Sequence, residues 1–207
     1  MLSIRTLAAA SALLLASTAA HAETWQIDPT HTRVGFRVSH MMVSSVEGSF
    51  PDVSGTLDLQ PGKLSDAKVS VEVTMNTVST GNDQRDEHLR TSDFLDVANH
   101  PTMTFSSTGL KAKRGGFELT GDLTIRGVTK RVTFTGTGLD QVAVDPWGNK
   151  RMGAHATTIV NRQDFGVAWN QALETGGLLV GDELPLQIDV EFTRPNDTAN
   201  QQIGLAE

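Results

Sequence analysis

The stretch LTGDLTIRGVTKRVTFT, residues 119–135, decides the fold. From Leu119 to Ile125 the odd positions hold apolar residues or glycine, and the even positions hold threonine or aspartate. After the pair Arg126-Gly127 the alternation resumes at Val132 and Phe134. A period of two is typical of antiparallel strands with one buried and one solvated face, and Arg-Gly between two such runs indicates a tight turn. The stretch therefore predicts a β-hairpin.

The same alternation recurs along the chain. It is found in residues 34–38, 69–75 and 186–192, and long runs such as 65–75 and 128–139 predict tall strands. Glycine- and proline-containing turn signals separate the runs: Pro61-Gly62, Arg114-Gly115-Gly116 and Asp145-Pro146-Trp147-Gly148. Consecutive strands joined by short turns form a meander, and closing about eight of them into an antiparallel up-and-down barrel removes the exposed edges. The sequence thus predicts an all-β barrel, with a β-sandwich as the structural alternative.

One segment, from Thr80 to Pro101, breaks this pattern and predicts a helical insertion. Thr80 with Asp83 fits a capping box, and Asp86 with Arg90 fits an i,i+4 ion pair on a helix. A polar helix inserted between strands with a few apolar anchors predicts a lid over one end of the barrel. The anchors are Leu89, Phe94, Leu95 and Val97.

The two ends of the sequence differ in composition from the rest. Residues 1–22 have the features of a cleaved secretory signal: a basic start at Arg5, a short apolar run and the small-residue cleavage site Ala20-His21-Ala22. Residues 195–207 are polar and are expected to form a flexible tail. We therefore expect one barrel domain over residues 23–194, secreted into a Gram-negative periplasm.

Composition excludes several classes of protein. The 207 residues contain no cysteine, which excludes disulfides, thiolate zinc sites and cysteine nucleophiles. The net charge of −7 argues against nucleic-acid binding, and outside the signal no window is apolar enough to cross a membrane. The histidines show no H-x-H, HxxxH or HExxH spacing, so neither a metal nor a cofactor is expected.

Two polar clusters are candidates for chemistry. Arg85, Asp86 and His88 could assist acid–base catalysis, although a solvated helix face is the favoured interpretation. In the cluster Asn161–Gly166, Arg162 would meet a ligand head group, or else a turn between Asp164 and Arg162 would end a strand, with Gly166 supplying an unusual backbone angle. No G-x-S-x-G or glycine-rich phosphate loop is present.

Methionines and tryptophans are further candidates for ligand contacts. Met41-Met42 could line an adaptable channel, with a core position the favoured interpretation for either residue alone. Trp25, Trp147 and Trp169 are expected to pack in the core or in turns.

Several motifs, in order, resemble those of the YceI-like family. They cover nearly the whole predicted domain, and Thr32 and Leu95 depart modestly from the family pattern. They are Trp25-x-Ile27-Asp28-x-x-His31-Thr32-x-Val34-x-Phe36-x-Val38-x-His40, Gly48-Ser49-Phe50, Thr80-Gly81-x-x-x-Arg85-Asp86-x-His88-Leu89, His100-Pro101-x-Met103-x-Phe105, Gly121-Asp122-Leu123-Thr124-Ile125-Arg126-Gly127 and Asn161-Arg162-x-Asp164-Phe165-Gly166.

The resemblance implies a lipocalin-like barrel that holds a long isoprenoid or fatty-acyl chain in its lumen. It also implies a periplasmic or secreted location, a homodimer and no catalysis. Strand parity and position at strand or helix ends give these lumen and mouth candidates: Phe36, Val38, Phe50, Val71, Val73, Leu89, Phe94, Phe105, Leu123, Ile125, Phe134, Phe165, Trp169, Ile188 and Val190. The head-group candidates are Arg85, His88 and Arg162.

The expected function is that of a periplasmic carrier that sequesters a polyprenyl, quinone-precursor-like or related amphiphilic lipid without a chemical step. The expected partner is that lipid, with no nucleic acid and no stable membrane insertion. Two alternatives remain: an enzyme acting on such a lipid through Arg85, Asp86 and His88, and a stress-linked interaction module.

Overall fold

Strands make up most of the described chain. The structure, a computed structural model, describes residues 22–60, 63–174 and 176–195. Within these ranges the chain forms eleven strands and one α-helix, α1 (Asp83–Arg90). The strands are β1 (Glu23–Ile27), β2 (Arg33–His40), β3 (Ser44–Phe50), β4 (Val53–Gln60), β5 (Lys63–Thr74), β6 (Thr102–Lys113), β7 (Gly116–Ile125), β8 (Val128–Gly138), β9 (Ala143–Val144), β10 (Asn149–Asn161) and β11 (Glu183–Pro195).

The strands close into an antiparallel barrel. From β4 to β8 each strand pairs with the next one in sequence, β8 then pairs with β10, and β10 pairs with β11 along thirteen residues of each. The sheet closes where β11 pairs with both β1 and β2. The predicted all-β barrel with a single helical insertion is confirmed, and the β-sandwich alternative is wrong.

Two of the eight barrel strands are built from two segments each. β1 and β2 run in the same direction along β11, separated by the 3-10 turn η1 (Pro29–His31). β3 and β4 continue one another in the same way, since β3 pairs with β2 and β4 pairs with β1. Pro51 lies between them, where a residue without an N–H interrupts the ladder.

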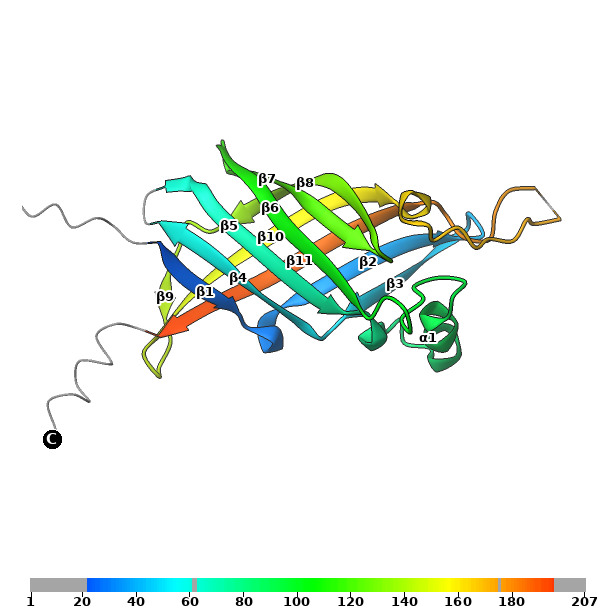
Figure 1. Ribbon diagram of the computed structural model, residues 1–207, viewed down its shortest axis with the longest axis horizontal. Coiled ribbons are helices and arrows are strands. Elements are labelled where there is room, and N and C mark those ends of the chain that lie inside the picture. The colour runs from blue at the N-terminus through cyan, green and yellow to red at the C-terminus, as the bar shows by residue number, and fades with distance from the viewer. Residues whose placement is uncertain (1–21, 61–62, 175, 196–207) are drawn as a thin grey trace, which may run out of the picture.

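The barrel has two unlike ends (Figure 1). At one end, on the right of the view, lie α1, the turn between β2 and β3, and the loop that joins β10 to β11. At the other end β1 begins and β11 stops, and Glu23 forms an ion pair with Arg194 there. The 3-10 turns η2 (Met75–Thr77) and η3 (Arg162–Phe165) belong to the first end. We call these the lid end and the floor end.

Burial follows the alternation that the sequence shows. In β7 every second residue from Phe117 to Ile125 is buried, and the residues between them are partly exposed. The turn at Arg126-Gly127 joins β7 to β8 as predicted. No helix in the described ranges has the length and apolar character needed to cross a membrane.

The predicted boundaries are only partly covered by the described residues. The expected signal, apart from Ala22, and the turn Pro61-Gly62 lie outside them, as does the expected tail after Pro195. Pro195 itself belongs to β11, one residue beyond the predicted end of the domain.

Candidate functional site

An apolar cavity of about 210 Å³ lies inside the barrel. Its wall receives side chains from β1 through β8, from β10 and β11, and from the lid end. Thr32, Thr104 and Arg162 are the polar residues of the wall, and all its other lining residues are apolar or glycine. Such a wall offers burial of hydrocarbon and almost no partner for a polar group.

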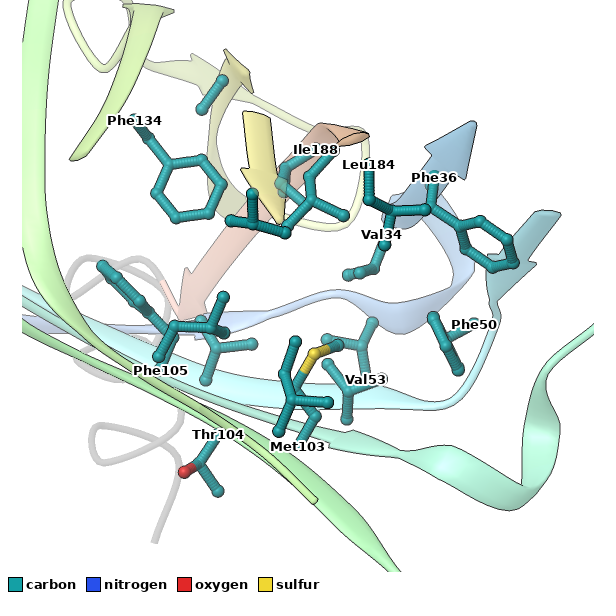
Figure 2. Close-up of a pocket in the computed structure, with 18 of the residues that line it drawn as sticks. Val34, Phe36, Phe50, Val53, Met103, Thr104, Phe105, Phe134, Leu184 and Ile188 are labelled. Atoms are coloured by element: carbon teal, nitrogen blue, oxygen red, sulfur yellow. The ribbon is translucent and has the colours of Figure 1, made fainter. Parts of the chain in front are cut away.

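Aromatic rings form much of the wall (Figure 2). Phe105 and Phe134 lie edge to face, with ring centroids 5.4 Å apart. Phe36 and Phe50 lie 5.6 Å apart. Figure 2 shows Phe105 and Ile188 pointing into the shared space, whereas Thr104 points away from it.

Fourteen of the fifteen lumen and mouth candidates line this cavity. Trp169 is the exception. Its ring packs on the lid against His88 and Phe94, at centroid distances of 5.2 Å and 5.0 Å.

The strand pattern contains more information on the cavity wall than the fifteen candidates show. Residues of the same parity on the same strands also line the cavity, and their spacing alone would have found them: Val34, Val69, Leu119, Leu186 and Phe192. Others come from loops, where parity gives no guidance: Met75, Val78, Val167 and Val180.

The floor end is packed solid. Five core residues there are at most 4% exposed and do not line the cavity: Trp25, Leu57, Ala67, Leu110 and Met152. They come from strands on all sides of the barrel, so together they form a floor. The cavity wall instead continues to the lid end, through Leu89, Leu95 and Val180. The cavity therefore faces the lid.

Three glycines let aromatic rings lie flat against the wall. A Cβ at Gly136 would fall 2.5 Å from Cζ of Phe117. A Cβ at Gly121 would fall 2.4 Å from Cζ of Phe105, and a Cβ at Gly48 would fall 2.3 Å from Cζ of Phe36. No side chain fits at these distances, so each ring occupies the space above a glycine of the neighbouring strand. This arrangement keeps the rings out of the centre of the barrel.

The helix of the lid begins differently from the prediction. Asn82, not Thr80, is the N-cap, and its side chain accepts a hydrogen bond from the Arg85 backbone N–H. Thr80 instead donates from its backbone N–H and its hydroxyl to Asp86, which is buried. The capping box of Thr80 with Asp83 is therefore wrong: the carboxylate that pairs with Thr80 belongs to Asp86, at the end of the first helical turn.

Arginines fasten the lid to the barrel. Arg90 donates to the backbone carbonyls of Asn76 and Val78 and pairs with Glu87, not with Asp86 as the i,i+4 spacing suggested. Arg126, from the turn between β7 and β8, donates through one Nη1 to the carbonyls of Phe94 and Gly166, at 2.9 Å and 3.0 Å. This one guanidinium joins the lid insertion to the loop after β10.

The three head-group candidates lie in different surroundings. Arg85 donates from Nε and Nη2 to the hydroxyl and carbonyl oxygens of Thr80. His88 Nε2 lies 2.9 Å from Asp93 Oδ2, and its ring contacts Phe94 and Trp169. Neither side chain lines the cavity, whereas Arg162 does.

Arg162 is 4% exposed and has a full set of protein partners. It donates to the carbonyls of Val167, Trp169 and Gly181 and pairs with Asp182 at 3.0 Å. Asp164 is exposed instead of pairing with Arg162, while Gly166 has the expected left-handed backbone, with a φ of 74°. The guanidinium thus organises the loop after β10.

An ionic cluster around Arg151 is not predicted from the sequence. Arg151 Nη1 lies 2.6 Å from Asp28 Oδ2 and 2.5 Å from Glu191 Oε1, and Nε lies 2.9 Å from Asp145 Oδ2. Burial alone would raise the pKa of Asp145, but hydrogen bonds from Arg151 and Asn149 lower it to about 2. Hydrogen bonds from Thr30, His31 and Arg151 hold the pKa of Asp28 well below its usual range.

This cluster also contains the only group of three histidine and carboxylate side chains among the described residues that lie close enough together to share a metal ion. One ligand atom each from Asp28, His31 and Glu191 lie within 4.8 Å of one another. Both carboxylates are already paired with Arg151, so a cation there would meet a resident positive charge. Asp28, Arg151 and Glu191 come from distant parts of the sequence, so no local spacing could have revealed their contacts.

Comparison with known proteins places the chain in a family. The profile of the YceI-like domain family matches residues 25–192. Protein YceI of Salmonella newport (strain SL254) is 38% identical over 159 residues, which are 76% of this chain and 83% of that protein. The chain therefore belongs to the YceI-like family, and the family resemblance of its motifs is confirmed.

Solved structures with the same fold agree with this placement. The Campylobacter jejuni YCEI protein is 30% identical, with a TM-score of 0.64 over 76% of this chain and 90% of that one. Burkholderia cenocepacia BcnA has a TM-score of 0.67 at 21% identity, over 80% and 98% of the two chains. A polyisoprenoid-binding domain from Saccharophagus degradans has a TM-score of 0.59 at 13% identity, over 83% and 98%. The last two show the fold alone.

Proposed function

We propose that this protein binds the hydrocarbon chain of a long isoprenoid or related lipid inside its barrel and carries it without a chemical step. The observation that carries the proposal is the nearly wholly apolar cavity, closed by a floor at one end and facing a lid at the other. A hydrocarbon chain fits this wall because no polar group is left unpaired when it enters.

The energetics favour a long chain over a small molecule. Burial of apolar surface is worth about 25 cal/mol per Å², so roughly 400 Å² supplies roughly 10 kcal/mol. That is comparable to the estimated cost of association, about 4–15 kcal/mol. A long isoprenoid has more hydrocarbon surface to bury than a small apolar molecule, so its net binding is stronger.

The comparisons support a binding protein. One structural neighbour is described as a polyisoprenoid-binding domain, and the chain shares its fold. Family membership supports the same class of function. The proposed ligand for this chain, a polyprenyl or quinone-precursor-like lipid, extends that description by analogy of fold and by the chemistry of the cavity.

The enzyme alternative has less support from the geometry. Asp86 accepts two hydrogen bonds from Thr80, Arg85 donates to Thr80, and His88 pairs with Asp93. These groups hold the lid together, and neither Arg85 nor His88 reaches the cavity wall. The proposed function accordingly uses no metal and no cofactor.

Native mass spectrometry of the protein from its own periplasm tests the proposal. The expected result is a protein that carries one lipid per chain, identified after solvent extraction, in a periplasmic fraction and as a homodimer. An empty protein that also takes up no added polyprenol would overturn the binding proposal. A protein that modifies an added lipid would favour the enzyme alternative.

Plugging variants locate the ligand. Val73→Trp and Phe105→Trp place extra bulk in the cavity wall, and we expect each to lower lipid occupancy in a folded barrel. Ser106→Trp is the matched control, since Ser106 is the exposed neighbour of Phe105 on the same strand. If folded plugged variants carry as much lipid as Ser106→Trp, the ligand lies elsewhere.

A further inference from the structure

Four exposed apolar side chains gather at the outer tip of the lid end. The described residues contain eight large hydrophobic side chains that are exposed. Met41, Met42 and Val43, in the turn between β2 and β3, are 40%, 66% and 82% exposed, and Leu178 in the neighbouring loop is 42% exposed. From the sequence, a core position is favoured for either methionine, and an adaptable channel is the alternative. Both expectations are wrong, because neither residue is buried or lines the cavity.

The turn between β2 and β3 and the loop between β10 and β11 lie at the same end of the barrel (Figure 1), and backbone contacts join them. The Met41 backbone N–H donates to the Leu179 carbonyl at 2.8 Å, and His40 and Val180 form an isolated bridge. A Cβ at Gly177 would lie 2.3 Å from Cε of Met42, so the Met42 side chain rests against that glycine. We define the mouth tip as residues 40–44 and 176–180.

The methionines are held in an unfavourable backbone conformation. Met41 and Met42 have φ values of 54° and 61°, inside a turn closed by the Val43 N–H and the His40 carbonyl. The left-handed region costs a side-chain-bearing residue about 1–2 kcal/mol, and Asn-Gly is the preferred pair at such positions. Asparagine and glycine at these two positions would therefore make the folded state more stable. The presence of methionines instead points to a role for their exposed side chains.

The mouth tip continues the apolar surface of the cavity. Val38, in β2, and Val180, in the loop between β10 and β11, both line the cavity. The floor end also has exposed apolar residues, Val142, Val144 and Trp147, but the packed floor separates them from the cavity. The tip of the lid end is thus the exposed apolar surface next to the cavity mouth.

The low charge of the mouth tip indicates which kind of surface it can bind. His40 and Glu174 are the only ionisable side chains in residues 38–46 and 170–181, although the whole chain carries −7. An acidic body is repelled by anionic lipid surfaces, whereas a nearly uncharged apolar tip fits a bilayer without net charge. Methionine, valine and leucine side chains bury favourably at the boundary of headgroups and acyl chains.

We propose that the mouth tip docks on the surface of a zwitterionic phospholipid bilayer and so brings the cavity mouth to the source of its ligand. The inference rests on the proposed function, because a protein that carries membrane-soluble chains has to meet them there. Docking involves the side chains of the mouth tip alone and is reversible, in keeping with four apolar anchors and no membrane-spanning helix among the described residues.

A variant that improves the turn gives a sharp test. Met41→Asn with Met42→Gly removes the two apolar side chains and supplies the residues preferred at positive φ, so we expect it to be at least as stable as the wild type. Co-flotation with phosphatidylcholine vesicles should fall at least tenfold. Trp147→Asp, at the 80% exposed tryptophan of the floor end, is the matched control and should float as the wild type does.

Loading separates this proposal from the proposed function. A polyprenol added from detergent solution should fill the double variant as completely as the wild type, while transfer from phosphatidylcholine vesicles should slow at least tenfold. The docking proposal is overturned if wild-type protein does not float with neutral vesicles, or if Trp147→Asp abolishes flotation and the double variant does not. Failure of both proteins to load from detergent would count against the binding proposal instead.

Discussion

At the scale of single residues, the absence of a side chain at Gly121 sets the position of the Phe105 ring. A Cβ there would fall 2.4 Å from the ring and 2.5 Å from the Ser106 carbonyl oxygen. We predict that Gly121→Ala forces Phe105 into the cavity and lowers the free energy of unfolding by about 1–3 kcal/mol, the usual cost of overpacking. Urea denaturation measures the change, and lipid occupancy should fall with it.

Gly109→Ala is the control for this prediction. A Cβ at Gly109 meets no atom within 4 Å, and Gly109 lies on the same strand as Phe105. If both alanine variants lose the same stability, the effect belongs to glycine replacement in a strand and not to the ring.

The ionic cluster around Arg151 makes the stability of the fold depend on pH. Asp145 has a folded pKa of about 2, lowered from 3.8, and the pKa of Asp28 is lowered as well. A carboxylate with a depressed pKa stabilises the fold above its unfolded pKa, and this contribution is lost as the pH falls through the folded value. We predict that Arg151→Met lowers Tm at pH 7, and that the difference from wild type shrinks as the pH falls from about 4 towards 2.

Arg131→Met is the comparison for Arg151→Met. Arg131 pairs with Asp122 across β7 and β8, but the two side chains are 58% and 40% exposed, and exposed pairs contribute little to stability. Thermal melts at pH 7 and pH 2.5 should show almost no change for this variant. Equal losses for the two arginines at both pH values would contradict the assignment.

At the scale of elements, the lid depends on a few hydrogen bonds to backbone carbonyls. Arg126 alone joins the carbonyls of Phe94 and Gly166. We predict that Arg126→Met loosens both segments, because a part-buried and an exposed carbonyl lose their charged donor, at about 0.5–1.5 kcal/mol of local stability for each hydrogen bond. Hydrogen exchange should speed up in residues 91–100 and 162–174 while β5, β6 and β7 keep their protection.

Ligand exchange gives a second measurement on the same variant. A looser lid should release a bound chain faster with little change in the amount bound at saturation. Arg114→Met, in the turn between β6 and β7 at the floor end, is the matched control. Unchanged exchange and release rates in Arg126→Met would show that this arginine does not hold the lid.

The sequence predicted the existence of the lid but not its internal contacts. Both Thr80 and Asn82 are good caps, and the choice of Asn82 depends on the burial of Asp86 beneath Thr80. The partners of Arg162 come from a loop, residues 167–182, that has no strand or helix period to place it. Local patterns predict elements, whereas these contacts depend on how the elements fold against one another.

At the scale of the whole molecule, alternation was sufficient to predict the barrel, because every strand buries one face in the same interior. It could not separate floor from cavity. Ala67 of the floor shows the same parity signal as Val69 and Val73 of the wall on the same strand, β5. The difference lies in how far along the barrel axis each residue falls, which depends on strand stagger and not on sequence period.

The packing of the floor end predicts how a cavity there would affect the stability of the whole barrel. Leu57 is 0% exposed, and Leu57→Ala should lower the free energy of unfolding by about 2–5 kcal/mol, since a cavity is left in packed surroundings. It should also let a longer chain be retained. Leu178→Ala, at an exposed leucine, should change stability by less than about 0.5 kcal/mol. Denaturant titration of both variants, with mass spectrometry of the retained lipid, checks both statements.

The pairing of β1 with β11 brings the two ends of the described chain together, and they leave the barrel from its floor end. A tether attached through either end therefore holds the protein by its closed side. The open side then faces away from the support, whichever end is chosen. Immobilised on a bead or fused to another domain, the barrel is held at the end opposite its mouth, which remains accessible to vesicles in suspension.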